Sequence, residues 1–400
     1  MNKEIAVITS AGIIIGLIAL IGYLIFTDER ESEEENGSET GTPEEVEEGN
    51  GDVSDDDEQE ASREPREPEV VASGLTIPWD VRFLPEGGML ITQRPGIFLL
   101  SENGGSVELD VDVEHIGEGG LLGLELHPRF SENRSVYLYR TIEEGGSVSN
   151  RVDRYFFDDE ESELVFEEEI VTDIPGARFH NGGRIAFGPD GYLYITTGDA
   201  EVPALSQERG SLAGKVLRVE DDGSLPDGNP FGTALYSYGH RNPQGLAWDS
   251  DGQLWSTEHG PVGFDELNRI EAGNNYGWPV MKGDQETGDM PPPEGEEFTD
   301  PVIHSGPNTA DTWAPSGAAY YDGSIFFAGL RGATLYEARI AGNNVELHEH
   351  MAGEFGRLRT VVVGPDEALY ITTSNRDGRG NPSDDDDRII RIDPDWLRDQ

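Results

Sequence analysis

The chain of 400 residues contains no cysteine, which excludes disulfides, thiolate metal sites, cysteine nucleophiles and a lipid-modified N-terminal cysteine. Lysine is almost missing too, since only Lys3, Lys215 and Lys282 occur. Acidic residues number 80 against 28 basic ones, which leaves a net charge of −52. Because such a surface repels a polyanion, we expect no nucleic-acid partner. Many carboxylates with few lysines are typical of halophilic proteins, whose self-repulsion is screened within about 3 Å in 1 M salt.

A long uncharged stretch lies near the N-terminus, from Ile5 to Phe26. Its length suffices for a helix that crosses a hydrocarbon layer of about 30 Å. We expect residues 1–27 to be a transmembrane anchor; the alternative is a cleaved secretory signal, whose apolar region would be shorter, about 7–15 residues. Lys3 precedes the stretch and acidic residues follow it, so the positive-inside tendency predicts a single-pass protein of the cell membrane with an extracellular domain. If the segment is cleaved, the protein is secreted instead.

Residues 28–69 have a second biased composition, rich in Glu, Asp, Ser and Gly and almost free of large apolar side chains. Such a segment cannot bury enough surface to offset its ordering entropy, and its like charges extend it. We therefore predict a disordered acidic linker between the membrane segment and a folded domain over residues 70–396.

From residue 70 onward, short β-branched and aromatic runs alternate with Gly, Asp, Asn and Pro, a pattern typical of strands and turns. One unit recurs, a turn containing Pro, Asp or Gly followed by an alternating apolar strand. Its six copies occupy residues 83–96, 127–140, 187–199, 248–260, 320–332 and 363–375. This repetition predicts an all-β fold, a six-bladed β-propeller, in which loops from every blade converge at one end. A β-sandwich or several small β domains would show the same alternation of short strands and turns, but not the six-fold repeat.

Several stretches are richer in His, Arg, Asp and Asn than ordinary turns. They are Phe179–Arg184, Thr197–Ala200, Tyr238–Gly245, Glu258–Pro261, Asp265–Asn268, Asn275–Pro279, Thr312–Ser316 and Arg357–Arg359. Taken singly, each has a structural alternative, because a histidine in a Gly-rich turn is commonly structural and an Asp after a strand commonly caps its own backbone. Arg357 and Arg359 share one strand face, which suits a carboxylate or phosphate ligand but equally the balance of an acidic surface.

Together and in order, the motifs HNGGRIAFGPDGYLYITTGDA, YSYGHRNPQGLAWD, EHGP, NYGWP, TWAPSG and GRLRTVVVGPDEALY closely resemble the soluble glucose and aldose sugar dehydrogenases that depend on pyrroloquinoline quinone (PQQ), also called glucose/sorbosone dehydrogenases. The resemblance runs from about Gly74 to Asp393. It implies a six-bladed propeller that oxidises aldoses at the anomeric carbon to lactones, with PQQ and calcium as cofactors.

The resemblance implies catalytic roles for three residues. His180 matches the general base that takes the proton of the anomeric hydroxyl while hydride passes to the quinone, and a neutral imidazole suits that task. Asp199 matches the carboxylate that orients this histidine. Arg241 matches an arginine beside the quinone oxygen, where a fixed guanidinium stabilises developing negative charge.

The resemblance also implies ligands for the cofactors. The residues expected to contact PQQ, besides Arg241, are Asn242, Thr312, Arg357 and Arg359. The carbonyls of Gly260 and Pro261 match ligands of the calcium ion at PQQ, and Glu266 with the Tyr276 backbone matches a further calcium site, in keeping with the preference of calcium for oxygen.

Three positions depart from the best-known glucose-oxidising members of that family. Glu118 and His259 stand where those proteins have glutamine, and both are expected to lie at the cofactor. Leu330 stands where they have a lysine, with Arg331 beside it as a substitute contact. These departures bear on substrate preference and cofactor affinity more than on the type of reaction.

Two other functions fit the same fold, since propellers host many activities. One is a cofactor-free surface propeller that binds a partner, and the other is a calcium-dependent propeller hydrolase acting on lactones or esters. On the favoured interpretation the partners are an aldose substrate and an electron acceptor, which an anchored enzyme would find in a membrane carrier.

Overall fold

The computed structural model describes residues 66–400 except 103, 289, 293 and 343. The predicted anchor over residues 1–27 and nearly all of the predicted linker over residues 28–69 fall outside this range. Across the described ranges, no helix is both long enough and apolar enough to cross a membrane.

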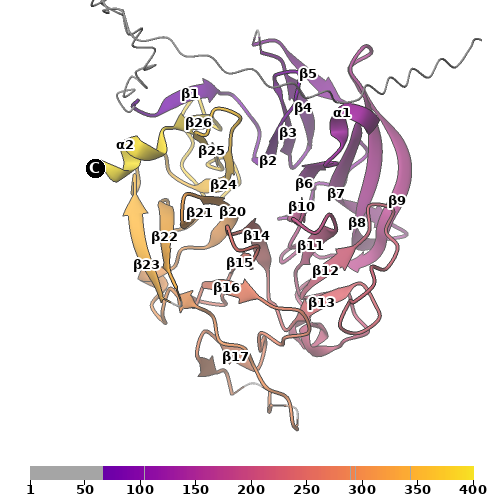
Figure 1. Ribbon diagram of the computed structural model, residues 1–400, viewed down its shortest axis with the longest axis vertical. Coiled ribbons are helices and arrows are strands. Elements are labelled where there is room, and N and C mark those ends of the chain that lie inside the picture. Colours follow the sequence, from indigo (N-terminus) through magenta and orange to yellow (C-terminus); the bar gives the residue numbers. More distant parts are fainter. Residues whose placement is uncertain (1–65, 103, 289, 293, 343) are drawn as a thin grey trace, which may run out of the picture. The chain divides into compact units, whose positions relative to one another are not determined.

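Six four-stranded antiparallel sheets surround one axis as the blades of a propeller (Figure 1). In chain order they are β2 (Pro78–Phe83), β3 (Met89–Gln93), β4 (Gly96–Leu100) and β5 (Ser106–Leu109); β6 (Leu121–Leu126), β7 (Ser135–Glu144), β8 (Ser147–Asp158) and β9 (Glu163–Pro175); β10 (Ile185–Phe187), β11 (Leu193–Thr197), β12 (Lys215–Val219) and β13 (Leu235–Tyr238); β14 (Pro243–Trp248), β15 (Leu254–Glu258), β16 (Glu266–Ile270) and β19 (Ile303–His304); β20 (Pro315–Tyr321), β21 (Ser324–Gly329), β22 (Leu335–Ala341) and β23 (Asn344–His350); and β24 (Leu358–Val363), β25 (Leu369–Thr373), β26 (Ile389–Ile392) and β1 (Glu69–Ala72). The predicted all-β, six-bladed propeller is confirmed.

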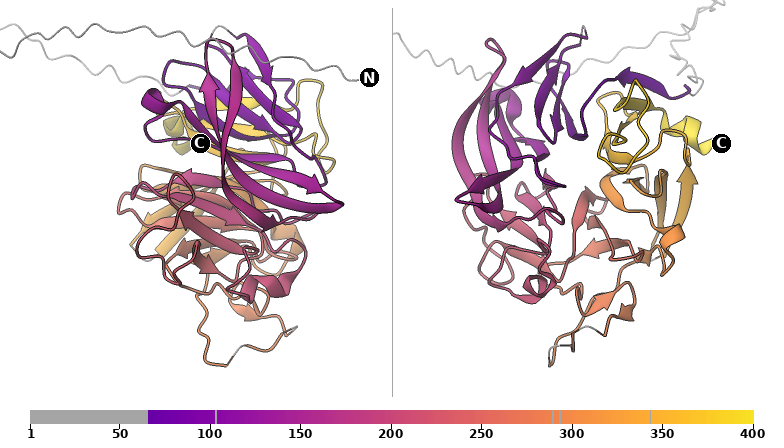
Figure 2. Two further views of the ribbon diagram at one scale, coloured as in Figure 1. Left: turned by 90° about the vertical axis from the view of Figure 1, so that its right-hand side faces the viewer. Right: turned by 180° about the vertical axis from the view of Figure 1, so that it is seen from behind.

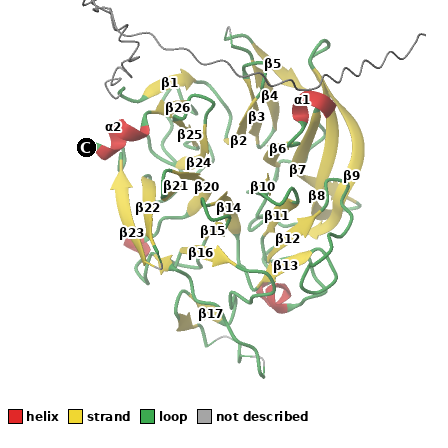
Figure 3. Ribbon diagram, viewed as in Figure 1, coloured by secondary structure: helices red, strands yellow, loops and turns green. Residues whose placement is uncertain are grey.

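Helices are few and short (Figure 3). They are α1 (Phe130–Asn133), α2 (Pro394–Arg398) and the 3-10 turns η1 (Pro203–Gln207) and η2 (Thr309–Asp311). A small hairpin of β17 (Met281–Lys282) and β18 (Gln285–Glu286) lies between β16 and β19 in sequence and projects from the ring in Figure 1.

Each copy of the recurring sequence unit supplies the turn after the innermost strand and the second strand of one blade. In the third copy, Phe187 pairs with Leu193 across the turn, and Gly191 in that turn has φ 83°, a left-handed conformation that favours glycine. The inner strands β2, β6, β10, β14, β20 and β24 face the axis in Figure 1, and the ring is seen from behind in Figure 2.

The first strand of the domain closes the ring. β1 pairs with β26 as the outermost strand of the last blade, with Glu69 opposite Arg391. Two backbone hydrogen bonds between Leu75 and Asp387 and a third, from the Ile77 N–H to the Asp387 carboxylate at 3.2 Å, continue this contact toward blade 1. Closure therefore joins residues from both ends of the domain.

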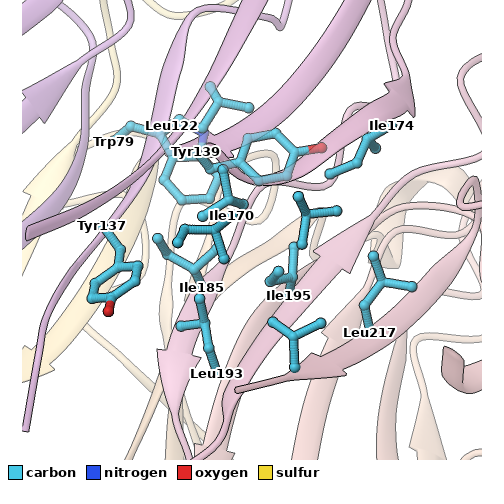
Figure 4. Packing of buried hydrophobic residues seen from close by; sticks show 13 residues of the cluster. Trp79, Leu122, Tyr137, Tyr139, Ile170, Ile174, Ile185, Leu193, Ile195 and Leu217 are labelled. Carbon is cyan, nitrogen blue, oxygen red and sulfur yellow. The ribbon is translucent and has the colours of Figure 1, made fainter. Parts of the chain in front are cut away.

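Apolar side chains fill the space between neighbouring blades. Figure 4 shows one such cluster, in which Leu122, Tyr139 and Ile185 lie with side chains from β2 to β12. Full burial of a side chain of this size contributes about 1.5–3 kcal/mol to folding, so these contacts hold the blades at a fixed angle.

The axis itself is filled by polar side chains. The Arg184 guanidinium lies 2.5 Å from the carboxylate of Asp80 and donates to the Gln244 carbonyl and the Thr360 hydroxyl. It also lies over the ring of Trp79, at 4.2 Å from the centroid. Because β2, β10, β14 and β24 supply these groups, one arginine connects four blades beneath the loops described next.

Candidate active site

The predicted site residues gather at one end of the propeller for a topological reason. In an antiparallel blade, the loop that enters the inner strand and the loop that leaves the second strand lie at the same end. His180 enters β10 and Asp199 leaves β11; Arg241 enters β14 and His259 leaves β15. Arg357 in turn enters β24.

His180 and Asp199 form a hydrogen-bonded pair, with Nδ1 2.7 Å from Oδ1. Asp199 is fully buried, whereas the side chain of His180 is 22% exposed. His180 has φ 59°, and its turn packs so closely on β11 that a Cβ at Gly198 would lie 1.9 Å from the His180 carbonyl oxygen. Glycine is therefore required at position 198 for the pair to form.

The partners of the imidazole define its tautomer. Nε2 lies 2.9 Å from a guanidinium nitrogen of Arg241, which can only donate. Nε2 must therefore accept, and the proton sits on Nδ1, where it is donated to Asp199. A neutral imidazole with its Nε2 lone pair on the exposed side is the form a general base requires.

Asp199 is held by further donors. Its Oδ2 accepts from the indole N–H of Trp278 at 2.9 Å, and its Oδ1 accepts from the N–H of Glu201 at 2.9 Å. The guanidinium of Arg241 lies 5.5 Å from the Trp278 ring centroid, within cation–π range. Trp278 thus contacts both neighbours of His180.

A second histidine–carboxylate pair lies at the same end of the next blade, between the loop that enters β14 and the last residue of β15. His240 Nδ1 lies 2.8 Å from Glu258 Oε2, and its Nε2 lies 2.8 Å from the Ser237 hydroxyl. His240 is fully buried and stacks on Tyr276, with ring centroids 4.7 Å apart. The other oxygen of Glu258 accepts from the N–H of Arg241, so this buried pair fixes the backbone that carries the arginine.

Buried guanidinium groups gather at the same end of the axis. Arg357 is paired with Asp377 at 2.8 Å and also donates to the Leu330 carbonyl. Arg359 is buried and donates to Gln244 at 3.0 Å, whereas Arg94 is buried and donates to the Gly117 carbonyl.

These cations lack enough anionic partners. Burial is the main cause that lowers the pKa of Arg94, Arg241 and Arg359 below that of a free guanidinium. In Arg94 and Arg359 the buried Nε–H has no hydrogen-bond partner among the described residues, and neither has His259 Nε2. The arrangement is suited to an anionic ligand with several acceptors.

Two of the three positions that depart from the family pattern, Glu118 and His259, lie close together. Burial opposes ionisation of Glu118, but His259, the Arg379 ion pair at 2.6 Å and the His180 N–H together lower the pKa of this carboxyl to about 2. Burial lowers the pKa of His259 to about 4, so this imidazole is neutral near pH 7. Glu118 is therefore a fixed anion that touches the turn of the candidate base.

The loop after β15 carries the predicted calcium carbonyls. The Gly260 N–H donates to Asp265 Oδ1 at 3.0 Å, and Oδ2 of the same carboxylate accepts from the hydroxyl of Thr312 at 2.5 Å. In the described part of the chain, the carbonyls of Gly260 and Pro261 accept no hydrogen bond, which leaves both oxygens for a cation. No group of three or more His, Asp or Glu side chains among the described residues could hold a metal by itself.

Glu266 and Tyr276 lie in a different environment. Glu266 is buried opposite Glu258 in the β15–β16 pairing and accepts from Asn268 and the Gly283 N–H. Burial and then the charge of Glu258 raise the pKa of Glu266 to about 8. Tyr276 uses its hydroxyl to donate to the Arg269 carbonyl, so only its backbone is available as a ligand.

The structure does not bring every predicted residue to the guanidinium groups. Asn242 uses its side-chain oxygen to accept from the Gly182 N–H at 2.9 Å, which holds the His180 turn. Thr312 is bonded to Asp265, and Arg331 is exposed without a hydrogen bond or ion pair within the described residues. Their role as cofactor contacts stays a prediction.

Sequence reasoning missed Arg94, Asp377 and Arg379, and it singled out the stretches that contain Asp265 and Trp278 without giving these two residues a role. A signal for Arg94 was present, since it follows the second strand of the first repeat, as Asp199 and His259 do in the third and fourth. Aligning the six repeats by their second strands would have found it.

Comparison with known proteins agrees with this geometry. The family model described as Glucose / Sorbosone dehydrogenase matches residues 75–390. The chain belongs to this family. An aldose sugar dehydrogenase of Escherichia coli K12 is 32% identical over 339 residues, spanning 78% of this chain and 90% of that protein.

Solved structures give the same result. A putative oxidoreductase (glucose dehydrogenase) from Thermus thermophilus is 44% identical with a TM-score of 0.75, and the PQQ-bound aldose sugar dehydrogenase of Streptomyces coelicolor is 40% identical with a TM-score of 0.73. Each alignment covers 82% of this chain and 99% of the other. The predicted membership of the glucose/sorbosone dehydrogenases, a family of oxidoreductases, is confirmed.

Proposed function

We propose that this chain is a PQQ-dependent aldose dehydrogenase, which oxidises the anomeric carbon of a sugar to a lactone with His180 as general base. The observation that carries the proposal is the Nε2 lone pair of His180, directed toward Arg241 and flanked by buried guanidinium groups with unpaired donors. A propeller that only binds a partner has no need of a polarised histidine beside such cations.

The residues at the site fit PQQ, which carries three carboxylates and an ortho-quinone. Arg94, Arg357 and Arg359 would take carboxylates, since a guanidinium binds a carboxylate by two parallel hydrogen bonds. Binding would also supply acceptors for the unpaired Nε–H groups of Arg94 and Arg359. The PQQ-bound Streptomyces coelicolor relative supports the same cofactor here.

Calcium fits the free carbonyls of Gly260 and Pro261, because this cation takes oxygen ligands at about 2.3–2.6 Å and accepts carbonyls readily. Glu266, with the Tyr276 backbone, would form a second site. A cation there would stabilise the ionised carboxylate of Glu266, which burial and the charge of Glu258 disfavour.

Bound PQQ would accept the hydride, which carries both electrons of the anomeric C–H bond. His180 Nε2 would take the proton of the anomeric hydroxyl, so that the C–O bond becomes the lactone carbonyl. Asp199 stabilises the resulting imidazolium through Nδ1, and Trp278 keeps that carboxylate in place. Arg241 occupies Nε2 in the absence of substrate, so it must release this nitrogen when the sugar hydroxyl donates there.

We also propose that residues 1–27 anchor the enzyme, with its domain outside the cell and a membrane carrier as electron acceptor. The uncharged stretch from Ile5 to Phe26 and the acidic residues after it support this arrangement. Fractionation of cells that express the full chain, with protease added from outside, tests it.

Reconstitution tests the catalytic proposal. The full-length chain is purified in high salt, stripped with chelator and supplied with PQQ, with calcium, with both or with neither. Dye reduction is then followed with a panel of aldoses. We expect turnover only when both are present.

His180→Ala should abolish this turnover while PQQ still titrates the protein. His348→Ala, on the outer strand β23, is the matched control and should leave activity unchanged. Failure of PQQ to bind in high salt would contradict the proposal and favour a cofactor-free binding propeller.

A further inference from the structure

Two arginines flank the side chain that precedes the candidate base. The guanidinium carbons of Arg178 and Arg379 lie 5.8 Å and 5.5 Å from the ring centroid of Phe179. Arg178 and Arg379 are exposed, whereas Phe179 is half-buried. The segment before His180 and the loop after β25 therefore place two guanidinium groups within cation–π range of one ring.

Contacts with Glu118 place these groups beside the reacting position. Arg379 donates to one oxygen of Glu118 at 2.6 Å, and the other oxygen accepts from the His180 N–H at 3.3 Å. The distance from the His180 backbone to Arg379 is thus spanned by a single carboxylate. Because Phe179 directly precedes His180, both arginines lie in the neighbourhood of the candidate base.

The charge at this edge is opposite in sign to that of the whole protein. Arg178 has no ion pair or hydrogen bond from its side chain to any described residue, and Arg379 uses only one guanidinium nitrogen on Glu118. Two cations thus face one carboxylate on a chain with a net charge of −52. Both guanidinium groups thus keep donors that no described residue takes up, and these donors are available to an anionic ligand bound beside them.

We propose that the substrate is an acidic aldose, a uronic acid whose carboxylate lies at the end remote from the anomeric carbon. Arg178 binds this carboxylate with support from the free donors of Arg379, and Phe179 packs against the sugar ring. The inference rests on the proposed function and names its substrate class.

The acidic surface does not oppose such a ligand at working ionic strength. The screening length is about 8 Å at 0.15 M salt and about 3 Å at 1 M, so distant carboxylates act weakly. Arg178 and Arg379 would be in direct contact with the substrate and are screened less. The buried Arg94 and Arg359 and the partly buried Arg357 remain for the cofactor.

The test compares sugars that differ only at carbon 6. The full-length holoenzyme is assayed with D-galacturonate against D-galactose and with D-glucuronate against D-glucose. We expect kcat/KM to be about tenfold higher for each acid, the size of effect that a charge-assisted bidentate contact supports. The gain should lie in KM, because the carboxylate is remote from the reacting carbon and contributes equally before and during reaction.

Arg178→Gln should reduce the acid-to-neutral ratio about three- to tenfold, again through KM. Arg129→Gln is the matched control, because it removes the same charge from an exposed arginine between β6 and β7, at the opposite end of the blade from Glu118. Calorimetric titration of the His180→Ala holoenzyme with D-galacturonate and D-galactose gives the same comparison without turnover.

The outcomes separate the two proposals. If neutral aldoses are oxidised at least as well as the acids, or if Arg178→Gln leaves the ratio unchanged, the acidic-sugar inference is wrong and the dehydrogenase proposal stands. If PQQ supports oxidation of neither class, the proposed function is wrong and this inference fails with it.

Discussion

Two histidine–carboxylate pairs lie at the same end of successive blades, and only one of them has a partly exposed histidine. His180 and Asp199 are 19 residues apart and join at 2.7 Å; His240 and Glu258 are 18 residues apart and join at 2.8 Å. The second nitrogen makes the difference. His240 Nε2 meets Ser237 inside the protein, whereas His180 Nε2 lies on the partly exposed side beside Arg241.

The comparison shows that a polarised imidazole is a common structural device and becomes a base only where its second nitrogen is accessible. Burial under Tyr276 turns the His240 pair into a support that fixes the Arg241 backbone. The His180 pair keeps 22% of its histidine side chain exposed. Substitutions in the His180 pair should therefore lower activity, whereas substitutions in the His240 pair should lower stability.

The largest effect is expected from His180→Ala. Loss of the general base should lower kcat about 10³- to 10⁴-fold, near the upper limit for one proton-transfer group. The free energy of unfolding should change little, because the side chain is partly exposed. Steady-state kinetics with saturating PQQ and calcium measures kcat, and denaturant unfolding measures the free energy of unfolding. A loss of stability with activity retained would show that His180 is a structural residue and not the base.

Asp199→Asn should lower kcat about 10²- to 10³-fold. An amide can donate to Nδ1, which would place the imidazole proton on Nε2 and remove the lone pair that the sugar hydroxyl needs. KM for the sugar should stay within about threefold, since Asp199 is fully buried and cannot touch it. A rise in KM without a fall in kcat would contradict this role.

His240→Ala should act on stability instead. It leaves the Glu258 carboxylate and the Ser237 hydroxyl without their buried partner, a loss of about 2–4 kcal/mol in the free energy of unfolding. Denaturant midpoints at fixed salt give the value. Activity per folded molecule should fall far less than in His180→Ala, and an equal fall would show that the two pairs are not distinct.

Trp278→Phe sharpens the comparison, because it removes one donor to Asp199 and keeps the aromatic ring near Arg241. We expect kcat to fall about tenfold, the worth of one hydrogen bond to a charged group, with KM nearly unchanged. Trp248→Phe, at the end of β14 remote from Arg241, serves as the control. Full activity in Trp278→Phe would show that the Glu201 N–H alone positions the carboxylate.

The smallest effect concerns Lys215, whose ammonium donates to the carbonyls of Leu205 and Ser206 behind both pairs. Burial lowers the pKa of Lys215 from 10.5 to about 7. Unfolding therefore takes up a proton between pH 7 and 10, and the contribution of this group to stability rises with pH through that window, by about 1 kcal/mol from pH 7 to 8.

Lys215→Met should be less stable than the wild type. Its free energy of unfolding should also lack the rise of about 1 kcal/mol from pH 7 to 8, because all other groups titrate alike in both proteins. Unfolding curves at pH 7 and 8 measure the difference between the two. An equal pH dependence would contradict the lowered pKa.

The architecture and the catalytic pair were accessible from the sequence for different reasons. The inner hairpins repeat a short pattern, so six blades could be counted, and the family resemblance located His180 and Asp199. Asp377 was not found, because only ring closure brings the loops of the first and last blades together. Arg94 would have been found by aligning the six repeats. The sequence also could not show that the side chains of Asn242 and Thr312 form hydrogen bonds with Gly182 and Asp265, because these bonds depend on the direction in which each side chain points.

The closing strand has a mechanical consequence. Any force applied through the residues that precede Glu69 enters the domain at β1, whose register with β26 spans only Glu69 to Ala72. Peeling β1 away would break these pairs one after another and would open the ring between its first and last blades. Those blades carry Arg94, Arg357 and Arg359, so tension on the N-terminal segment would pull on the arginines proposed to bind the cofactor before it reached His180.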